Sequence, residues 1–297
     1  MNITPADNFR TINRCIGMFQ SITKAGVIGL PIAHSLSPRL FNYWLKKYNI
    51  NGLYKAYSVK KNAVSKFLNS MEERGFTGLN VTVPHKQTVM EYVDQLSDRA
   101  LKIGAVNTIT LKKNGLLYGD NTDGFGFIEN LKQYYKGMDA YTGTCVVIGA
   151  GGAARAIVVA LIGVGAKKIY ITNRTRSNGE KLAEDIGGPI NILDWSKRHD
   201  SLAEATFVVN ATTLGMNGKP PLELRLDELP KKALVTDIVY SPLQTKLLIN
   251  SKAKGNPTVD GIGMLLHQAR PGFASWFGEE PIVTKDLRNH VLTINEN

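Results

Sequence analysis

The chain has 297 residues, of which 43% are hydrophobic and 21% are charged, and its formal net charge is +11. This length predicts two domains, and this composition is typical of an ordinary globular protein. No apolar run is long enough to span a bilayer, so we expect no membrane partner.

The positive charge is concentrated in residues 1–123, which carry 16 Lys and Arg against 8 Asp and Glu. Nucleic-acid binding is compatible with such a charge, but the basic residues form no long block and the sequence contains no nucleic-acid motif. Attraction of an anionic substrate and cofactor explains the charge equally well. We therefore expect no nucleic-acid partner.

Residues 1–21 lack an apolar signal core, and Asp7 argues against a transit peptide, so we interpret this segment as an N-terminal extension. Cys15 and Cys145 are the only cysteines and lie in dissimilar contexts. A reduced, cytoplasmic protein is the default expectation. No cluster of residues suggests a metal site.

Strand-like apolar runs alternate with helical patterns along most of the chain, which indicates an α/β fold. In the first third we expect strands at 27–30, 54–59 and 79–83, helices at 38–48 and 62–74, and a hairpin of 105–111 with 116–118. A helix over 124–133 then leads into a second domain.

The second domain begins with the most specific pattern of the chain. A strand expected at 145–149 passes into a helix at 152–162 through the fingerprint Gly149, Ala150, Gly151, Gly152, Ala153 and Ala154. The first glycine permits a tight turn, the second lets phosphates approach the backbone, and Ala154 is small enough for close helix packing. Free N–H groups and the helix dipole attract negative charge, so we predict a dinucleotide pyrophosphate site.

The residues after the next strand, expected at 168–172, indicate which dinucleotide binds. They are Asn173, Arg174, Thr175 and Arg176, with no carboxylate to accept a bond from a free ribose 2′-hydroxyl. The planar donor fork of arginine suits a phosphate. We therefore predict that the cofactor is NADP.

The remaining pattern completes a Rossmann-type domain. We expect helices at 178–186 and 243–253 and strands at 190–193, 206–210, 234–238 and 257–260. The chain is helical again from Gly261, and we expect this part to return to the first domain.

Four polar clusters follow expected strands, at 34–38, 80–86, 104–108 and 119–124. Ser37 precedes a proline and is predicted to cap a helix. Lys86 is expected to open a helix, and Asp123 is a plausible helix cap. Together the clusters offer hydroxyls, an amide, a lysine and an aspartate, which suit a small polyhydroxylated acid.

In chain order, these motifs resemble the shikimate dehydrogenase family from about residue 25 to residue 278. The motifs are Gly-x-Pro-Ile-x-His-Ser-x-Ser-Pro at 29–38, Asn-Val-Thr-x-Pro-x-Lys at 80–86, Gly-Ala-x-Asn-Thr at 104–108, Asn-Thr-Asp-x-x-Gly at 121–126 and Gly-x-Gly-Met-Leu-x-x-Gln-Ala at 261–269. The resemblance implies NADP-dependent, reversible reduction of 3-dehydroshikimate to shikimate, on the pathway to chorismate and aromatic amino acids.

The resemblance also implies the roles of individual residues. Lys86 and Asp123 would be catalytic, and Gly261 and Met264 would line the nicotinamide pocket. The substrate would be held by Ser35, Ser37, Thr82, Asn107, Tyr240 and Gln268. The family further implies a substrate domain at 22–123 completed by 261–297, a Rossmann domain at 124–260, and a cleft that can close.

Three positions depart from the family pattern. Phe41 stands where many members have histidine, at a helix position that we expect to serve packing. Asn178 stands where another arginine can support the 2′-phosphate, and Arg176 is a candidate substitute. Ala154 replaces a third glycine or serine and is still small.

Carbonyl reduction needs a hydride on carbon and a proton on oxygen. Lys86 is the candidate acid with Asp123 orienting it, and a water relay is the alternative. Two other functions stay open: a quinate- or NAD-using enzyme of the same superfamily, and a non-catalytic NADP sensor. The assembly is open too, with a homodimer as one option.

Overall fold

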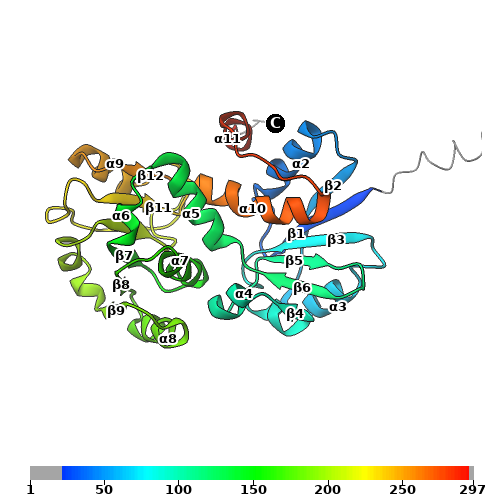
Figure 1. Ribbon diagram of the computed structural model, residues 1–297, viewed down its shortest axis with the longest axis horizontal. Coiled ribbons are helices and arrows are strands. Elements are labelled where there is room, and N and C mark those ends of the chain that lie inside the picture. The colour runs from blue at the N-terminus through cyan, green and yellow to red at the C-terminus, as the bar shows by residue number, and fades with distance from the viewer. Residues whose placement is uncertain (1–21, 294–297) are drawn as a thin grey trace, which may run out of the picture.

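The computed structural model describes residues 22–293 and contains two α/β domains that lie side by side (Figure 1). The expected extension at 1–21, with Cys15, lies outside the described residues, as do residues 294–297. Within residues 22–293, no helix combines the length and apolarity that crossing a membrane requires.

The first domain is built on a mixed sheet of six strands in the order β2-β1-β3-β5-β6-β4. The strands are β1 (Thr23–Gly29), β2 (Gly52–Ser58), β3 (Phe76–Val81), β4 (Gln95–Leu96), β5 (Thr108–Leu111) and β6 (Leu117–Asp120). β1 runs parallel to β2 and β3, whereas β5 is antiparallel to β3 and β6. The expected hairpin is thus confirmed, and Gly115 adopts the positive φ of +80° that its turn requires.

The helices of this domain are α2 (Ser37–Lys47), α3 (Val64–Asn69) and α4 (Asp98–Ile103), with short 3₁₀ turns η1 (Lys61–Ala63) and η2 (Thr88–Tyr92). The expected long helix at 62–74 is therefore wrong in extent, because η1 and α3 end at Asn69. β4 and α4 were not expected, since two and six residues are too few for a periodic pattern.

The second domain contains a parallel sheet of six strands in the order β12-β11-β10-β7-β8-β9, which is the Rossmann order. The strands are β7 (Thr144–Ile148), β8 (Lys168–Thr172), β9 (Ile190–Leu193), β10 (Phe207–Asn210), β11 (Leu234–Asp237) and β12 (Thr258–Val259). The helices are α6 (Asp139–Thr142), α7 (Gly152–Gly163), α8 (Arg176–Ile186) and α9 (Lys246–Lys254), with 3₁₀ turns η3 (Trp195–Lys197) and η4 (Asp200–Leu202). The strand order reverses between β7 and β10, where ligands bind in such sheets.

Two helices connect the domains, α5 (Asp123–Tyr134) and α10 (Ile262–Phe277), and they pack directly against each other (Figure 1). Glycines allow this approach. A Cβ on Gly126 would lie 2.6 Å from the Met264 carbonyl oxygen, and one on Gly263 would lie 1.8 Å from Asn130 Oδ1. Each domain therefore meets the other through a rigid helix pair that begins at the edge of the site described below.

The return of the chain to the first domain is confirmed. α10 crosses the first sheet, where a Cβ on Gly78 would lie 1.9 Å from Trp276 Nε1, and α11 (Lys285–Leu292) packs on α2. Phe41 is fully buried and stacks on Tyr54 with ring centroids 3.9 Å apart. Its expected packing role is confirmed, and such burial contributes roughly 1.5–3 kcal/mol.

Candidate active site

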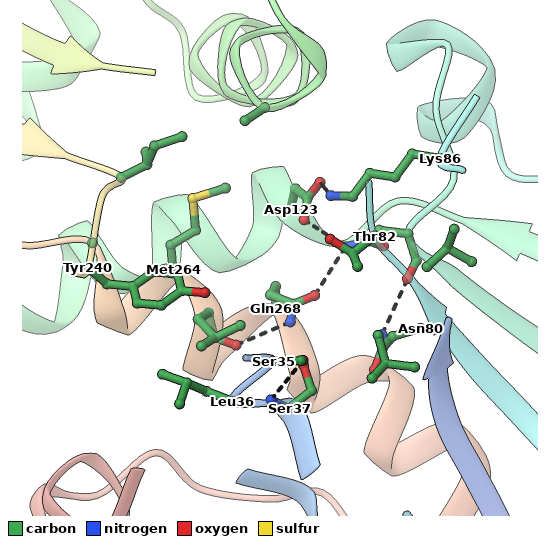
Figure 2. Close-up of a pocket in the computed structure, with 17 residues that line it drawn as sticks. Ser35, Leu36, Ser37, Asn80, Thr82, Lys86, Asp123, Tyr240, Met264 and Gln268 are labelled. Carbon is green, nitrogen blue, oxygen red and sulfur yellow. Dashed lines mark hydrogen bonds and ion pairs between the residues drawn. The ribbon is translucent and has the colours of Figure 1, made fainter. Parts of the chain in front are cut away.

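A cavity of about 220 Å³ lies between the two domains (Figure 2). It brings together residues from loops that are more than 200 positions apart in the chain. Its lining includes Ser35, Ser37, Thr82, Lys86, Asn107, Asp123, Tyr240 and Gln268, together with Ala153, Gly261 and Met264. All eight residues that the sequence assigned to catalysis or substrate binding thus face one space.

Lys86 and Asp123 form an ion pair at the wall of this cavity, with Lys86 Nζ 2.5 Å from Asp123 Oδ2. Asp123 is the first residue of α5, where its negative charge also interacts favourably with the helix dipole. Its side chain is 9% exposed and that of Lys86 is 24% exposed, so water screens the pair only in part. The side chains point toward each other and leave the ammonium group at the cavity edge (Figure 2).

The local structure around these two residues differs from the expectation. Asp123 is not a helix cap: Thr122 occupies the cap position, and the Asp123 carboxylate is engaged by Lys86 and Asn107 instead. Lys86 does not open a helix either, because the next element is η2, which starts at Thr88. Lys86 lies in a turn held by tertiary contacts, in which its carbonyl accepts the Val106 N–H at 2.8 Å.

Asn107 and Gln268 form the floor between the lysine and the serines. Asn107 Nδ2 donates to Asp123 Oδ1 at 2.7 Å and to Gln268 Oε1 at 3.1 Å. The Gln268 amide in turn donates to the Leu265 carbonyl at 3.2 Å. Because these amides are buried, their hydrogen bonds fix which polar atoms they present.

The serine loop precedes α2, and here the predicted cap is also wrong. Leu36 is the cap residue and Ser37 is already helical, so the Ser37 side chain makes no capping bond. The Ser35 hydroxyl accepts the Ser37 N–H at 3.3 Å and so supports the turn. Ser35 therefore has a local structural role that the sequence did not indicate, whereas the Ser37 hydroxyl does not cap the helix.

Thr82 and Tyr240 complete the polar lining from opposite domains. Tyr240 lies beside Met264, on the side of the cavity opposite Lys86 (Figure 2). Burial raises the pKa of the Tyr240 phenol, so it stays a neutral hydroxyl. Among residues 22–293, neither hydroxyl has a hydrogen-bond partner, which leaves both for a ligand.

A second cavity of about 350 Å³ lies at the reversal point between β7 and β10. Gly149 has φ of +115°, and its missing Cβ would lie 2.9 Å from the Ala211 carbonyl oxygen. A Cβ on Gly151 or Gly152 would meet nothing within 4 Å, so the backbone there faces open space at the start of α7. These residues fit a pyrophosphate group, because exposed N–H groups at a helix N-terminus bind anions.

The two arginines of the expected 2′-phosphate site are in different situations. Arg174 lines the second cavity with Asn173 and has no ion pair within the described residues. Arg176 instead binds Glu180 and Asp194, each at 2.7 Å, and is not part of the cavity lining. Asn173 holds the intervening turn by donating to the Thr175 carbonyl at 2.8 Å. Arg174 is thus the guanidinium that a bound phosphate can meet without breaking an existing pair.

Several lining residues were not selected from the sequence. Asn80 is a buried amide within β3, and a polar side chain in an apolar strand is a signal that could have identified it. Trp195 lines the second cavity but follows β9 without any motif. Among residues 22–293, no group of three or more His, Cys, Asp or Glu side chains is placed to hold a metal ion.

Comparisons with known proteins agree with this geometry. The model of the shikimate dehydrogenase substrate-binding domain matches residues 27–109, and the shikimate/quinate 5-dehydrogenase model matches residues 132–238. A shikimate dehydrogenase (NADP(+)) of Roseobacter denitrificans is 49% identical over 275 residues, which cover 92% of this chain and 99% of that protein. The chain belongs to the shikimate dehydrogenase family.

Solved structures of the family have the same fold. A shikimate 5-dehydrogenase from Thermus thermophilus, in complex with NADP(H) and shikimate, has a TM-score of 0.81 and 34% identity, covering 91% of this chain and 98% of that chain. A quinate dehydrogenase from Corynebacterium glutamicum, in complex with NAD, has a TM-score of 0.86 and 30% identity, covering 92% of this chain and 99% of that chain. Solved structures with this fold thus include one complex with NADP(H) and shikimate and one with NAD.

Proposed function

We propose that the protein is an NADP-dependent shikimate dehydrogenase, an oxidoreductase that interconverts 3-dehydroshikimate and shikimate in aromatic amino acid biosynthesis. The observation that carries this proposal is the shared cavity. It holds the Lys86–Asp123 pair, hydroxyl and amide groups, and two residues, Ala153 and Ile238, that also line the second cavity.

The proposed mechanism divides the reaction between cofactor and protein. When bound, NADPH supplies the hydride to the carbonyl carbon. Lys86 donates the proton to the developing alkoxide, and Asp123 holds the Lys86 ammonium at the cavity edge. In the reverse direction Lys86 accepts that proton from the substrate hydroxyl.

The other lining residues are proposed to bind and orient. Hydroxyl groups of Ser35 and Ser37 donate to the substrate carboxylate, and Thr82 and Gln268 hold ring hydroxyls. Asn107 borders the same space and holds Asp123 and Gln268 in place. Tyr240, Gly261 and Met264 lie where substrate and nicotinamide would meet. Such positioning supplies much of an enzymatic rate, because it removes the entropic cost of bringing the reactants together.

For the cofactor, we propose that Gly149, Ala150, Gly151, Gly152 and Ala153 bind the pyrophosphate. Arg174 binds the 2′-phosphate, supported by Asn173 and Thr175 in the same turn. Arg176 is the weaker candidate, because binding phosphate would cost it two carboxylate partners. We also propose a substrate domain at 22–123 with 261–297, a Rossmann domain at 124–260, and a cytoplasmic location. We further propose a homodimer, and sedimentation of the purified protein tests this oligomeric state.

Quinate oxidation with NAD is the second candidate, because a quinate dehydrogenase with NAD is among the solved structures with this fold. The residues after β8 disfavour it, since they offer an arginine and no carboxylate to the ribose. An assay at 340 nm with shikimate or quinate, each with NADP⁺ or NAD⁺, separates the candidates. We expect shikimate with NADP⁺ to give the highest kcat/KM. A higher value for quinate with NAD⁺ would reverse the assignment, and NADP binding without any turnover would indicate a sensor.

A further inference from the structure

The side-chain amide of Asn107 uses all of its main hydrogen-bonding positions inside the protein. Its Oδ1 accepts the Thr108 hydroxyl at 2.8 Å and the Thr122 N–H at 2.9 Å. Its Nδ2 donates to Asp123 and to Gln268, as described above. A flipped amide would place an NH₂ group against the Thr122 N–H, which can only donate. The protein therefore fixes one orientation of this amide.

The Thr108 hydroxyl is directed toward Asn107 by the residues behind it. Asn80 Nδ2 donates to Thr108 Oγ1 at 3.4 Å, and the Tyr54 hydroxyl donates to Asn80 Oδ1 at 2.7 Å. Because Thr108 Oγ1 accepts the Asn80 N–H, the single hydroxyl hydrogen of Thr108 is available for Asn107 Oδ1. The hydrogen bonds thus run in one direction, from Tyr54 to the Asp123 carboxylate, through residues that are each 6% exposed or less.

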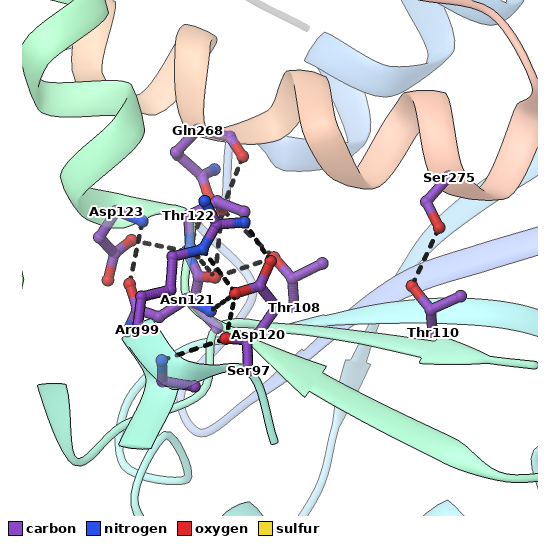
Figure 3. Close-up of polar contacts among 12 residues, drawn as sticks. Ser97, Arg99, Thr108, Thr110, Asp120, Asn121, Thr122, Asp123, Gln268 and Ser275 are labelled. Carbon is purple, nitrogen blue, oxygen red and sulfur yellow. Dashed lines mark hydrogen bonds and ion pairs between the residues drawn. The ribbon is translucent and has the colours of Figure 1, made fainter. Parts of the chain in front are cut away.

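The neighbouring Thr122 hydroxyl has a different partner. It lies 3.1 Å from Asn107 Oδ1 but 2.8 Å from the Gln268 carbonyl oxygen, and a hydroxyl has one hydrogen to give. Its position at the start of α5, between β6 and α10, is visible in Figure 3. Thr108 is therefore the side chain that supplies a hydroxyl hydrogen to the Asn107 amide.

We propose that Thr108 is a positioning residue for the reaction, which acts through Asn107 on Asp123 and Gln268. This inference rests on the proposed function. Thr108 is not part of the lining of the 220 Å³ cavity, so it does not contact substrate itself. Its hydroxyl keeps the Asn107 N–H groups on Asp123 and Gln268, and so keeps the partner of Lys86 and a substrate-binding amide in place. Loss of the hydroxyl removes one of the two hydrogen bonds that fix Asn107 Oδ1 and leaves the Thr122 N–H, so Asp123 and Gln268 are held less firmly.

The same strand provides a matched control. Thr110 lies two residues further along β5, so its side chain is on the same face of the sheet. Its hydroxyl lies 3.2 Å from Ser275 Oγ and accepts from Trp276 Nε1 at 3.1 Å, away from Asn107 (Figure 3). Thr110→Val removes a hydrogen-bonded hydroxyl from the same strand without touching the Asn107 amide.

The test compares Thr108→Val, Thr108→Ser and Thr110→Val in the full chain. We expect Thr108→Val to lower kcat/KM for shikimate about three- to tenfold, the effect of one lost buried hydrogen bond, with contributions from both kcat and KM. Thr108→Ser keeps the hydroxyl and recovers most of this loss. Thr110→Val should have the same kcat/KM as wild type, and calorimetry should give an unchanged NADP affinity in all three variants.

Three results would overturn the inference. Equal kinetics of Thr108→Val and Thr110→Val would show that the hydroxyl has no special role. Parallel loss of NADP affinity, shikimate affinity and thermal stability, without rescue by serine, would show a merely structural role. Absence of shikimate turnover in the wild type would overturn the proposed function and this inference with it, whereas an active wild type separates the two.

Discussion

The 220 Å³ cavity, proposed as the substrate cavity, and the 350 Å³ cavity, proposed as the cofactor cavity, differ in what lines them. The substrate cavity is lined by side chains from both domains, and its buried members satisfy one another, as Asn107 does with Asp123 and Gln268. The cofactor cavity includes the continuous loop Gly149–Ala153, in which the backbone at Gly151 and Gly152 faces open space. The substrate cavity thus depends on hydrogen-bonded side chains, whereas the cofactor cavity depends on glycines that leave the backbone accessible.

This difference has a consequence for mutation. Removing a side chain from the substrate cavity leaves buried partners unpaired, so its effect spreads through the network and is not additive. The cofactor loop has few side-chain partners to lose, and it is disturbed by adding atoms. Variants in the two cavities should therefore affect different ligands.

The largest effect is expected for Lys86→Ala. Loss of a general acid reduces kcat by roughly 10²–10⁴-fold. NADP affinity should not change, because the pyrophosphate loop is on the other domain. Steady-state kinetics and NADP calorimetry measure the two quantities separately.

Asp123→Asn should also reduce kcat, and the double variant should lose far less than the product of the two single losses, because the pair acts as a unit. Unchanged kcat in Lys86→Ala, or fully multiplicative losses in the double variant, would contradict the pairing of Lys86 with Asp123.

A second effect concerns α10, which joins the two domains. His267 Nε2 lies 2.8 Å from Gln133 Oε1 of α5. Burial, together with the nearby positive charge of Arg270, lowers the pKa of His267 to about 4. Since the unfolded-state pKa is about 6.5, the unfolded chain binds a proton first as the pH falls, and stability is lost between about pH 6.5 and 4, by up to about 3 kcal/mol. Urea unfolding across this range measures the loss, and His267→Gln should flatten the profile. An unchanged slope in that variant would assign the pH dependence to other groups.

The next experiment compares Arg174, which lines the second cavity, with Arg176, which does not. Arg174→Asp should weaken NADP binding roughly 10- to 150-fold, the cost of a lost charged hydrogen bond, with little effect on NAD. Arg176→Gln should have a smaller effect, because Arg176 is already paired with Glu180 and Asp194. Fluorescence titration with 2′,5′-ADP and 5′-AMP compares both variants. An equal loss for the two nucleotides would exclude a 2′-phosphate contact.

The smallest effects are expected in the serine loop. Ser35→Ala and Ser37→Ala should each weaken shikimate binding about three- to tenfold. Ser35→Ala should also lower the free energy of unfolding, by about 0.5–1 kcal/mol, because the Ser35 hydroxyl accepts the Ser37 N–H. Calorimetry and urea unfolding check these values, and a stability loss confined to Ser37→Ala would reverse the assignment.

Where local chemistry determines the structure, the sequence was sufficient. The strands at 168–172 and 190–193 match the structure to the residue, and the glycine fingerprint lies where a strand meets a helix. Turn geometry and close packing there depend on adjacent residues, so the pattern carries the information. The return of α10 to the first domain was expected from the fold pattern and again from the family resemblance, since periodicity alone does not place a helix.

The errors occur where distant contacts determine the local structure. The Lys86 turn is held by the Val106 N–H, twenty residues further along the chain, which donates to the Lys86 carbonyl. The Asp123 carboxylate likewise binds Lys86 and Asn107 and does not cap α5. Periodicity and capping rules describe neighbours in sequence, so they cannot show such contacts.

The contrast between the two cavities is tested most directly by a cross-titration of two variants, Lys86→Ala and Gly151→Val, with shikimate and with NADP. A Cβ at Gly151 meets no protein atom within 4 Å, so Gly151→Val should keep its fold and its shikimate affinity. Its NADP affinity should fall at least about tenfold, since the side chain occupies the phosphate approach. Lys86→Ala should bind NADP as wild type does while turnover is lost. Joint loss of both ligands in either variant would contradict the account.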